Sequence, residues 1–228
     1  MNTLRKKSRA HTLHTQAGFS MVEVLVTLII LMVGLLGLAG LMVQSQRSEL
    51  ESYQRVQAII LLQDMVGRIN ANRNVAVCYA FTTTPSAGTP YVGTTGANLL
   101  TAVPTTCAAV TTATALQTTL LGQDITAWQN LLNGAAETFG GNNAGAMVGA
   151  RGCVSYDATT VLPQLDPTTG LPNGLFLAGT GIYTVSVAWQ GTGDTFAPPA
   201  SLNCGKNLYG AETRRRVVSQ TLRIASLT

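Results

Sequence analysis

The sequence predicts an α+β fold, in which one long N-terminal α-helix packs on a C-terminal antiparallel β-sheet. Residues 24–43 form a nearly continuous apolar run, which continues without a proline into an amphipathic segment that ends near Asn72. Residues 152–225 contain three segments with strand-like alternation, separated by loops rich in Gly and Pro. Because a half-buried sheet needs a cover on its apolar face, we expect the amphipathic half of the helix to provide it.

The first 18 residues have the features of a basic leader. Arg5, Lys6, Lys7 and Arg9 account for the whole formal net charge of +4, since the remaining chain holds ten basic and ten acidic residues. Positive charge before an apolar segment is typical of a cytoplasmic N-terminus. The rest of the chain has no basic patch interleaved with aromatic residues, so we expect no nucleic-acid partner.

The apolar run at residues 24–43 is long enough to cross a membrane. It holds 20 residues, of which Thr27 is the only clearly polar one, and at ~1.5 Å per residue it spans a hydrocarbon core of about 30 Å. The basic cluster precedes the run and no A-x-A cleavage site follows it, so we expect this segment to stay attached. Gly34, Gly37 and Gly40 fit close helix packing in a membrane, and equally a stretch that loosens outside lipid.

One acidic residue, Glu23, interrupts the start of this apolar helix. An ionised carboxylate on a lipid-facing helix costs ~2–3 kcal/mol at mid-membrane and less near a helix end. A simple membrane anchor gains nothing from this group. A subunit that must meet a charged group on a neighbour does gain from it.

Beyond residue 44 the sequence predicts that the helix continues with one apolar side. The first residues of that side are expected to cover the sheet: Leu50, Tyr53, Val56 and Ile60. The same surface continues through Leu62, Met65, Val66 and Ile69. Residues 59–62 are all apolar and surround the helix, so we expect burial on more than one side there.

Residues 78–123 are expected to form a variable surface loop. Between Thr82 and Thr119, 14 of 38 residues are threonine and none is charged, which is typical of an irregular segment. Next, Asp124 fits the N-cap of a short helix over residues 125–132 that ends at Asn133. The expected buried face of this helix is formed by Trp128, Leu131 and Leu132.

Three later segments, residues 152–157, 182–190 and 216–225, predict strands. In the second, one face carries Tyr183, Val185, Val187 and Trp189. In the third, one face carries Val218, Gln220, Leu222 and Ile224. The prolines between these segments are expected to mark loops: Pro163, Pro167, Pro172, Pro198 and Pro199. Sequential strands with modest connections favour an antiparallel sheet of three or four strands.

The distribution of histidine limits the chemistry that this chain can perform. His11 and His14 both lie in the leader, so the rest of the chain has no histidine for acid–base catalysis or for metal binding. We therefore expect no cofactor, no metal and no enzymatic activity.

Four cysteines, Cys78, Cys107, Cys153 and Cys204, lack the close spacing of zinc ligands. In an exported domain they would form two disulfides, in one of three connectivities between which the sequence alone does not choose. We favour Cys78–Cys107, which closes the uncharged loop, together with Cys153–Cys204, which ties an early strand to the segment before the last strand.

Residues 18–25, which begin Gly-Phe-Ser-Met-Val-Glu, resemble the class III signal of type IV prepilins and pseudopilins, with the basic leader before them and the apolar helix behind. The resemblance implies that a prepilin peptidase cuts after Gly18. Phe19 would then be the N-methylated new N-terminus, and Glu23 would guide assembly. It also implies the type IV pilin fold.

Four later motifs resemble the PilV class of minor pilins, the type IV pilus modification family: residues 149–154, 183–191, 204–205 and 215–218. The resemblance implies a protein that primes pilus assembly with other minor pilins, the major pilin and the inner-membrane assembly machinery. It would have a leader at residues 1–18, a membrane-spanning polymerisation segment at residues 19–44 and a periplasmic domain at residues 45–228. It would sit first in the inner membrane with a cytoplasmic N-terminus, and later in the pilus at the cell surface.

Other functions explain the sequence less completely. A pseudopilin of a type II secretion system shares every N-terminal feature, but the size of the body and the C-terminal motifs favour a minor pilin. A periplasmic enzyme on a membrane anchor has little chemistry available without histidine. A generic anchored domain leaves Glu23 unexplained.

Overall fold

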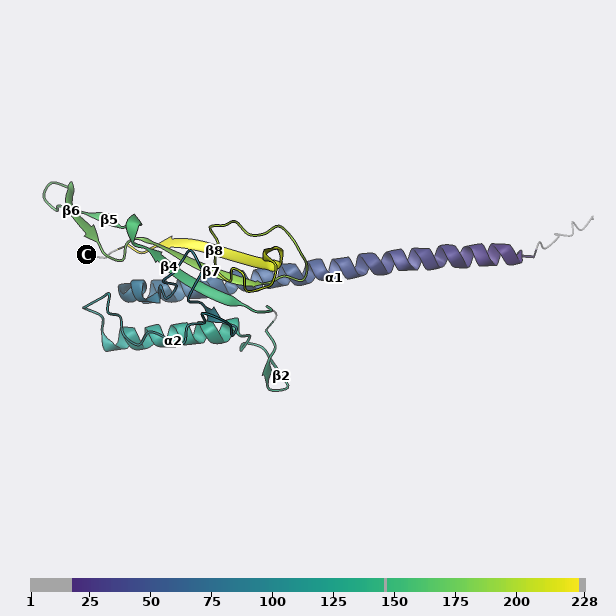
Figure 1. The fold of residues 1–228 in the computed structure, drawn as a ribbon, viewed down its shortest axis with the longest axis horizontal. Coiled ribbons are helices and arrows are strands. Elements are labelled where there is room, and N and C mark those ends of the chain that lie inside the picture. The colour runs from purple at the N-terminus through teal and green to yellow at the C-terminus, as the bar shows by residue number, and fades with distance from the viewer. Residues whose placement is uncertain (1–17, 146, 226–228) are drawn as a thin grey trace, which may run out of the picture. The chain divides into compact units, whose positions relative to one another are not determined.

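A computed structural model describes residues 18–145 and 147–225, so the four cations and two histidines of the basic leader lie outside the described residues. Figure 1 shows the fold as a ribbon, coloured from the N-terminus to the C-terminus, with the larger elements labelled. The elements follow one another in this order, with η marking short 3-10 helices: α1 (Met21–Ala71), η1 (Arg73–Tyr79), β1 (Val92–Gly93), α2 (Ala115–Leu132), β2 (Thr138–Phe139), β3 (Asn142–Asn143), β4 (Arg151–Asp157), η2 (Ala158–Thr160), β5 (Leu162–Leu165), β6 (Pro172–Leu177), β7 (Ile182–Gln190), η3 (Glu212–Arg214) and β8 (Arg215–Arg223).

The chain divides into two compact units between Gln46 and Arg47. The described part of the first unit consists of residues 18–20 and the N-terminal part of α1, and all of its residues are exposed. Within the described chain, α1 is the one helix that is both long enough and apolar enough to cross a membrane.

The second unit is built on a four-stranded antiparallel sheet with the order β1-β4-β7-β8. Strand β7 has the bounds that the sequence predicts, and the residues of its predicted inner face, from Tyr183 to Trp189, are all buried. The antiparallel sheet is therefore confirmed. Two smaller antiparallel ribbons, β2-β3 and β5-β6, lie outside it.

Two helical segments cover one face of this sheet. Ala58, Leu62, Met65 and Ile69 of α1 share one buried cluster with Trp128 of α2 and with Val154, Val185 and Val187 of the sheet. The indole Nε1 of Trp128 also donates a hydrogen bond to the carbonyl oxygen of Leu61, at 2.8 Å, which ties the two helices together. The predicted α+β arrangement of a long N-terminal helix with an antiparallel sheet is confirmed.

The prediction that residues 50–60 of α1 cover the sheet with Leu50, Tyr53, Val56 and Ile60 was wrong. Tyr53, Val56 and Ile60 are exposed by 48%, 52% and 58%, and Leu50 is exposed as well. The buried stripe is instead formed by Gln54, Ala58, Leu62, Met65 and Ile69. The small side chain of Ala58 allows the helix to pack closely against the core. Residues 59–62 are apolar on every side of the helix, so hydrophobicity alone does not show which side is buried.

The helix that the sequence places at residues 125–132 begins ten residues earlier. Helix α2 starts after Thr114, whose side chain accepts a hydrogen bond from the Gln117 backbone N–H, while the Gln117 side chain accepts one from the Thr114 N–H. This reciprocal capping box fixes the N-terminus. Asp124 is therefore not the N-cap, although the end at Leu132 and the burial of Trp128 and Leu132 are as predicted.

The Thr-rich region at residues 78–123 is not wholly a surface loop. Phe81, Tyr91 and Val92 are buried, and β1 pairs with β4 at the edge of the sheet. Apolar and aromatic residues between the threonines therefore anchor this region to the core. Two of the prolines expected in loops, Pro163 and Pro172, lie instead in the β5-β6 ribbon.

Candidate processing and assembly site

The predicted cleavage site lies in irregular backbone directly before α1. Gly18, Phe19 and Ser20 are exposed and precede the first helical residue, Met21. The Ser20 side-chain oxygen accepts a hydrogen bond from the Val22 N–H at 3.3 Å, and its carbonyl accepts one from the Glu23 N–H at 3.0 Å. Ser20 thus starts the helix and leaves the Gly18–Phe19 peptide bond exposed and outside the helix.

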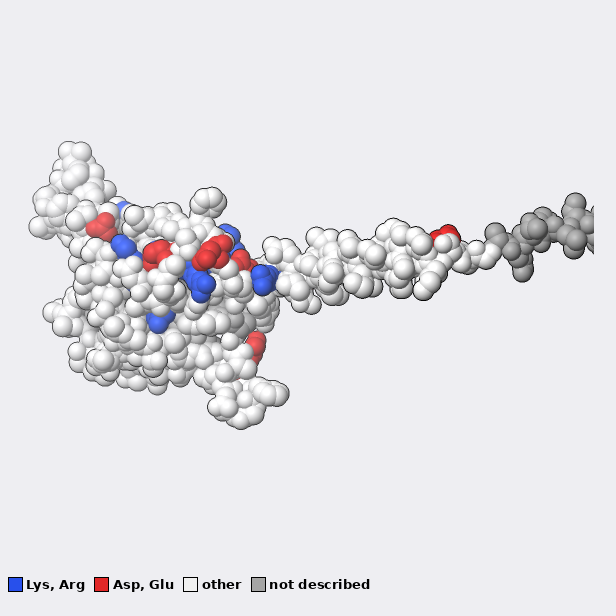
Figure 2. All heavy atoms as spheres, turned by 45° about the vertical axis from the view of Figure 1, so that its right-hand side comes forward, with Lys and Arg blue, Asp and Glu red and all other residues white. Residues whose placement is uncertain are grey.

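Glu23 lies in the first turn of α1, five residues after Gly18. A carboxylate is favoured there, because the first helical N–H groups carry partial positive charge. Its side chain is exposed and forms no ion pair with any residue that the structure describes. From residue 18 to residue 46 it is the only charged group, as the single red group on that segment in Figure 2 shows.

A second carboxylate of α1, Glu51, is paired, unlike Glu23, and it connects the C-terminal half of the helix to the sheet. Arg216 of β8 and Thr192 each donate a hydrogen bond to Oε1 of Glu51, both at 3.0 Å. Partial burial opposes ionisation of Glu51, but the hydrogen bond from Thr192 and the charge of Arg216 outweigh it and lower the pKa of this carboxyl. The sequence analysis missed this tie, because its partners are more than 140 residues apart in the chain.

A second network joins α1 to η1 and α2, and it explains the role of Asp124. The Arg68 guanidinium donates hydrogen bonds to Asp64 at 2.7 Å and to Asp124 at 2.8 Å. The Tyr79 hydroxyl donates to the other oxygen of Asp124 at 2.5 Å. Burial and this hydrogen bond raise the pKa of Tyr79 well above its usual value. Asp124 thus holds the end of α1 against α2.

Each of the four cysteines is in a disulfide. Cys78 at the end of η1 is bonded to Cys107 in the loop before α2, with their Cα atoms 5.5 Å apart. Cys153 of β4 is bonded to Cys204 in the segment before β8, with a Cα separation of 5.8 Å. No cysteine of the described chain is left free.

A family model described as the prokaryotic N-terminal methylation motif matches residues 6–39, the segment that contains Gly18, Phe19 and Glu23. No curated protein and no solved structure matches the chain. The apolar helix and the motif fit a protein anchored in the inner membrane. Together with the long helix and the antiparallel sheet, the motif supports a type IV pilin or pseudopilin, a class of structural proteins that are processed by prepilin peptidase.

Proposed function

We propose that this protein is a minor pilin of the PilV class that takes part in priming type IV pilus assembly. The observation that carries the proposal is Glu23, which lies five residues after Gly18 at the start of α1 and is followed by an uncharged stretch at residues 24–46. It forms no ion pair with any residue that the structure describes. Its expected partner is the N-terminal ammonium of a neighbouring subunit, which attracts it strongly where the surroundings are apolar.

An exposed apolar stripe on the second half of α1 supports a role in assembly. Tyr53, Val56 and Ile60 are each about half exposed, although they are large and apolar. Contiguous apolar surface of this kind is typical of interaction sites. We infer that helices of other pilin subunits cover this stripe, both the other minor pilins and the major pilin.

The proposal includes a division of the chain and a route through the cell. Residues 1–18 are the leader, residues 19–44 span the inner membrane and polymerise, and residues 45–228 form the periplasmic domain with the variable loop at residues 78–123. The disulfides Cys78–Cys107 and Cys153–Cys204 belong to this proposal, because the periplasm is oxidising. We propose no enzymatic function and no cofactor.

The test of processing is mass spectrometry of the mature N-terminus in a strain with active prepilin peptidase. The expected mature chain begins with N-methyl-Phe19, and Gly18→Leu should leave the leader attached. Met21→Leu is the matched control, because it changes an exposed apolar side chain inside the helix and should be cleaved normally. An uncleaved native chain, or a cut beyond residue 43, contradicts the proposal.

A pseudopilin of a type II secretion system is the alternative, since the methylation motif is common to both classes. Deleting the gene separates the two functions. We expect fewer surface pili and normal release of secreted enzymes. Normal piliation with enzymes retained in the periplasm would instead assign the protein to the secretion system.

A further inference from the structure

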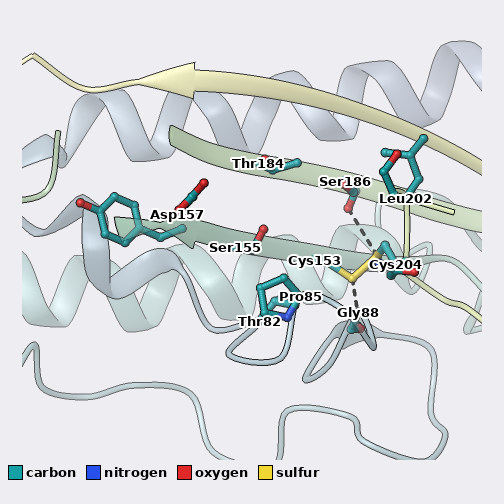
Figure 3. A pocket seen from close by; sticks show the side chains of 13 residues that line it. Thr82, Pro85, Gly88, Cys153, Ser155, Asp157, Thr184, Ser186, Leu202 and Cys204 are labelled. Carbon is teal, nitrogen blue, oxygen red and sulfur yellow. Dashed lines mark hydrogen bonds between the residues drawn. A yellow bond between two sulfur atoms is a disulfide. The ribbon is translucent and has the colours of Figure 1, made fainter. Parts of the chain in front are cut away.

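A polar hollow lies on the outer face of the sheet, on the side away from the buried helices (Figure 3). Its volume is about 350 Å³. Strands β4 and β7 form the floor, and the walls come from two loops, at residues 82–88 and 201–204. This volume is near the lower end of the range of small-molecule sites, roughly 300–1,000 Å³.

The floor of the hollow presents an ordered set of hydroxyl groups. Ser155 of β4 lies directly opposite Thr184 of β7, and Cys153 lies opposite Ser186. The hydroxyls of Ser155, Thr184 and Ser186 form no hydrogen bond with any described residue, although all three line the cavity. Each hydroxyl can donate one hydrogen bond and accept two, so this floor can pair with a ligand that is itself rich in hydroxyls.

The two loops that form the walls are fixed to the sheet and to each other. The disulfide between Cys153 and Cys204 fixes one wall to the floor. Gly88 has a φ of +66°, and a Cβ there would collide with the carbonyl oxygen of Asn203, so glycine lets the two loops touch. The side-chain Oδ1 of Asn203 is buried without a hydrogen-bond partner among the described residues. The residue itself lines the hollow, so it adds a side-chain amide to the walls.

The charges around the hollow limit the class of ligand. No Lys or Arg lines it, and Asp157 is its one carboxylate, so a phosphate or another anion has no counter-charge there. Pro85 and Leu202 add apolar surface to the walls. Hydroxyls, an amide and a few apolar contacts match a molecule with polar edges and C–H faces. We propose that this hollow binds a neutral mono- or disaccharide.

This inference does not rest on the proposed role in pilus assembly, and it is tested by direct binding. The probes are glucose, galactose, N-acetylglucosamine and lactose, measured by saturation-transfer NMR on the full-length chain. The detergent must be zwitterionic, because a sugar headgroup would compete for the site. We expect at least one of the four saccharides to saturate in the millimolar range.

Two variants locate the binding. Removing two floor hydroxyls with Ser155→Ala and Thr184→Val together should weaken binding about tenfold or more. Ser201→Trp, at an exposed position of the wall, should block the hollow without disturbing the core. Thr221→Val is the control: Thr221 lies opposite Thr184 on β8, is exposed and does not line the hollow, so binding should be unchanged.

Two results overturn the proposal. One is that none of the four saccharides saturates; if calcium or spermidine binds in that case, Asp157 is the recognition group and the ligand is a cation. The other is that the double variant and Ser201→Trp, with native unfolding temperatures, bind as tightly as the native chain.

Discussion

Glu23 and Glu51 lie on the same helix but have opposite surroundings. Glu51 accepts two hydrogen bonds, from Thr192 and Arg216, whereas Glu23 has no ion-pair partner among the described residues. The contacts of Glu51 stabilise the fold. The exposed Glu23 carboxylate is open to contact with a neighbouring subunit, as we propose for assembly.

Glu23→Ala should separate membrane insertion from assembly. Insertion is expected to be unchanged or easier, because an ionised carboxylate costs ~2–3 kcal/mol or less in this region of a bilayer. Incorporation into pili, measured by immunoblot of sheared filaments, should fall strongly, because the neighbour's ammonium loses its partner. Thr27→Ala, one turn further along, is the control, since its hydroxyl only donates to the carbonyl of Val24. Normal incorporation of Glu23→Ala would refute the assembly role.

Glu51 gives a prediction about pH. Its pKa in the folded chain is below the 4.5 of the unfolded group, so the folded state binds fewer protons. The stabilisation is therefore present above pH 4.5 and is lost as the pH falls through the folded pKa. Glu51→Gln should lower the thermal midpoint at neutral pH, by the equivalent of about 1 kcal/mol or less, because the pair is partly exposed.

The difference between native and Glu51→Gln midpoints should shrink when the pH is lowered below 4.5. Glu49→Gln is the matched control, because Glu49 is exposed on the same helix and forms no ion pair with a described residue. A midpoint difference that stays constant with pH would show that Glu51 acts through packing rather than through its charge.

The helices and strands differ in how far the sequence specifies them. The whole of β7 follows from alternation, because Tyr183, Val185 and Val187 point to one buried face. The start of α2 does not follow from alternation, because its first turns are rich in threonine. Thr118, Thr119 and Thr126 bond their hydroxyls to backbone carbonyls of the preceding turn. Residues that look like loop formers are thus accommodated inside a helix, which composition alone does not predict.

The capping box at Thr114 gives a testable prediction about the start of helix α2. Thr114→Ala removes the side-chain acceptor for the Gln117 N–H and should destabilise the domain by about 0.5–2 kcal/mol. Thr126→Ala, in the exposed middle of the same helix, should be neutral or slightly stabilising, because alanine is the better helix former. Chemical denaturation measures both variants. Equal effects of the two changes would mean that the capping box does not set the start of α2.

The two sites of the molecule differ in how much of them the sequence reveals. Gly18, Phe19 and Glu23 lie within six consecutive residues, so a linear pattern is enough to find them. The polar hollow is formed by β4, β7 and two loops from distant parts of the chain, so only folding brings Ser155, Thr184 and Asn203 to the same cavity. The sequence placed each of these residues in a strand or a loop, but it could not place the three around one cavity.

The second half of α1 should be an integral part of the globular domain. Leu62, Met65 and Ile69 are buried against the sheet, and each is worth ~1.5–3 kcal/mol. Their sum is comparable to the net stability of a whole domain, about 5–15 kcal/mol. A fragment of residues 45–228 made in an oxidising compartment should therefore be soluble and folded, whereas residues 74–228 should aggregate. Both fragments keep all four cysteines, so the disulfides cannot account for the difference.

Cooperative thermal unfolding, followed by circular dichroism, distinguishes the two fragments. Within residues 45–228, Leu62→Ala should cost about 2–5 kcal/mol, because it leaves a cavity in the core. Ile60→Ala should cost far less, because Ile60 is 58% exposed. This pair tests the helix face directly, since hydrophobicity alone predicts that both residues are buried. If residues 74–228 unfold cooperatively at a similar temperature, or if the two alanine variants are equally destabilised, then α1 does not supply the core of the domain through the stripe that contains Leu62.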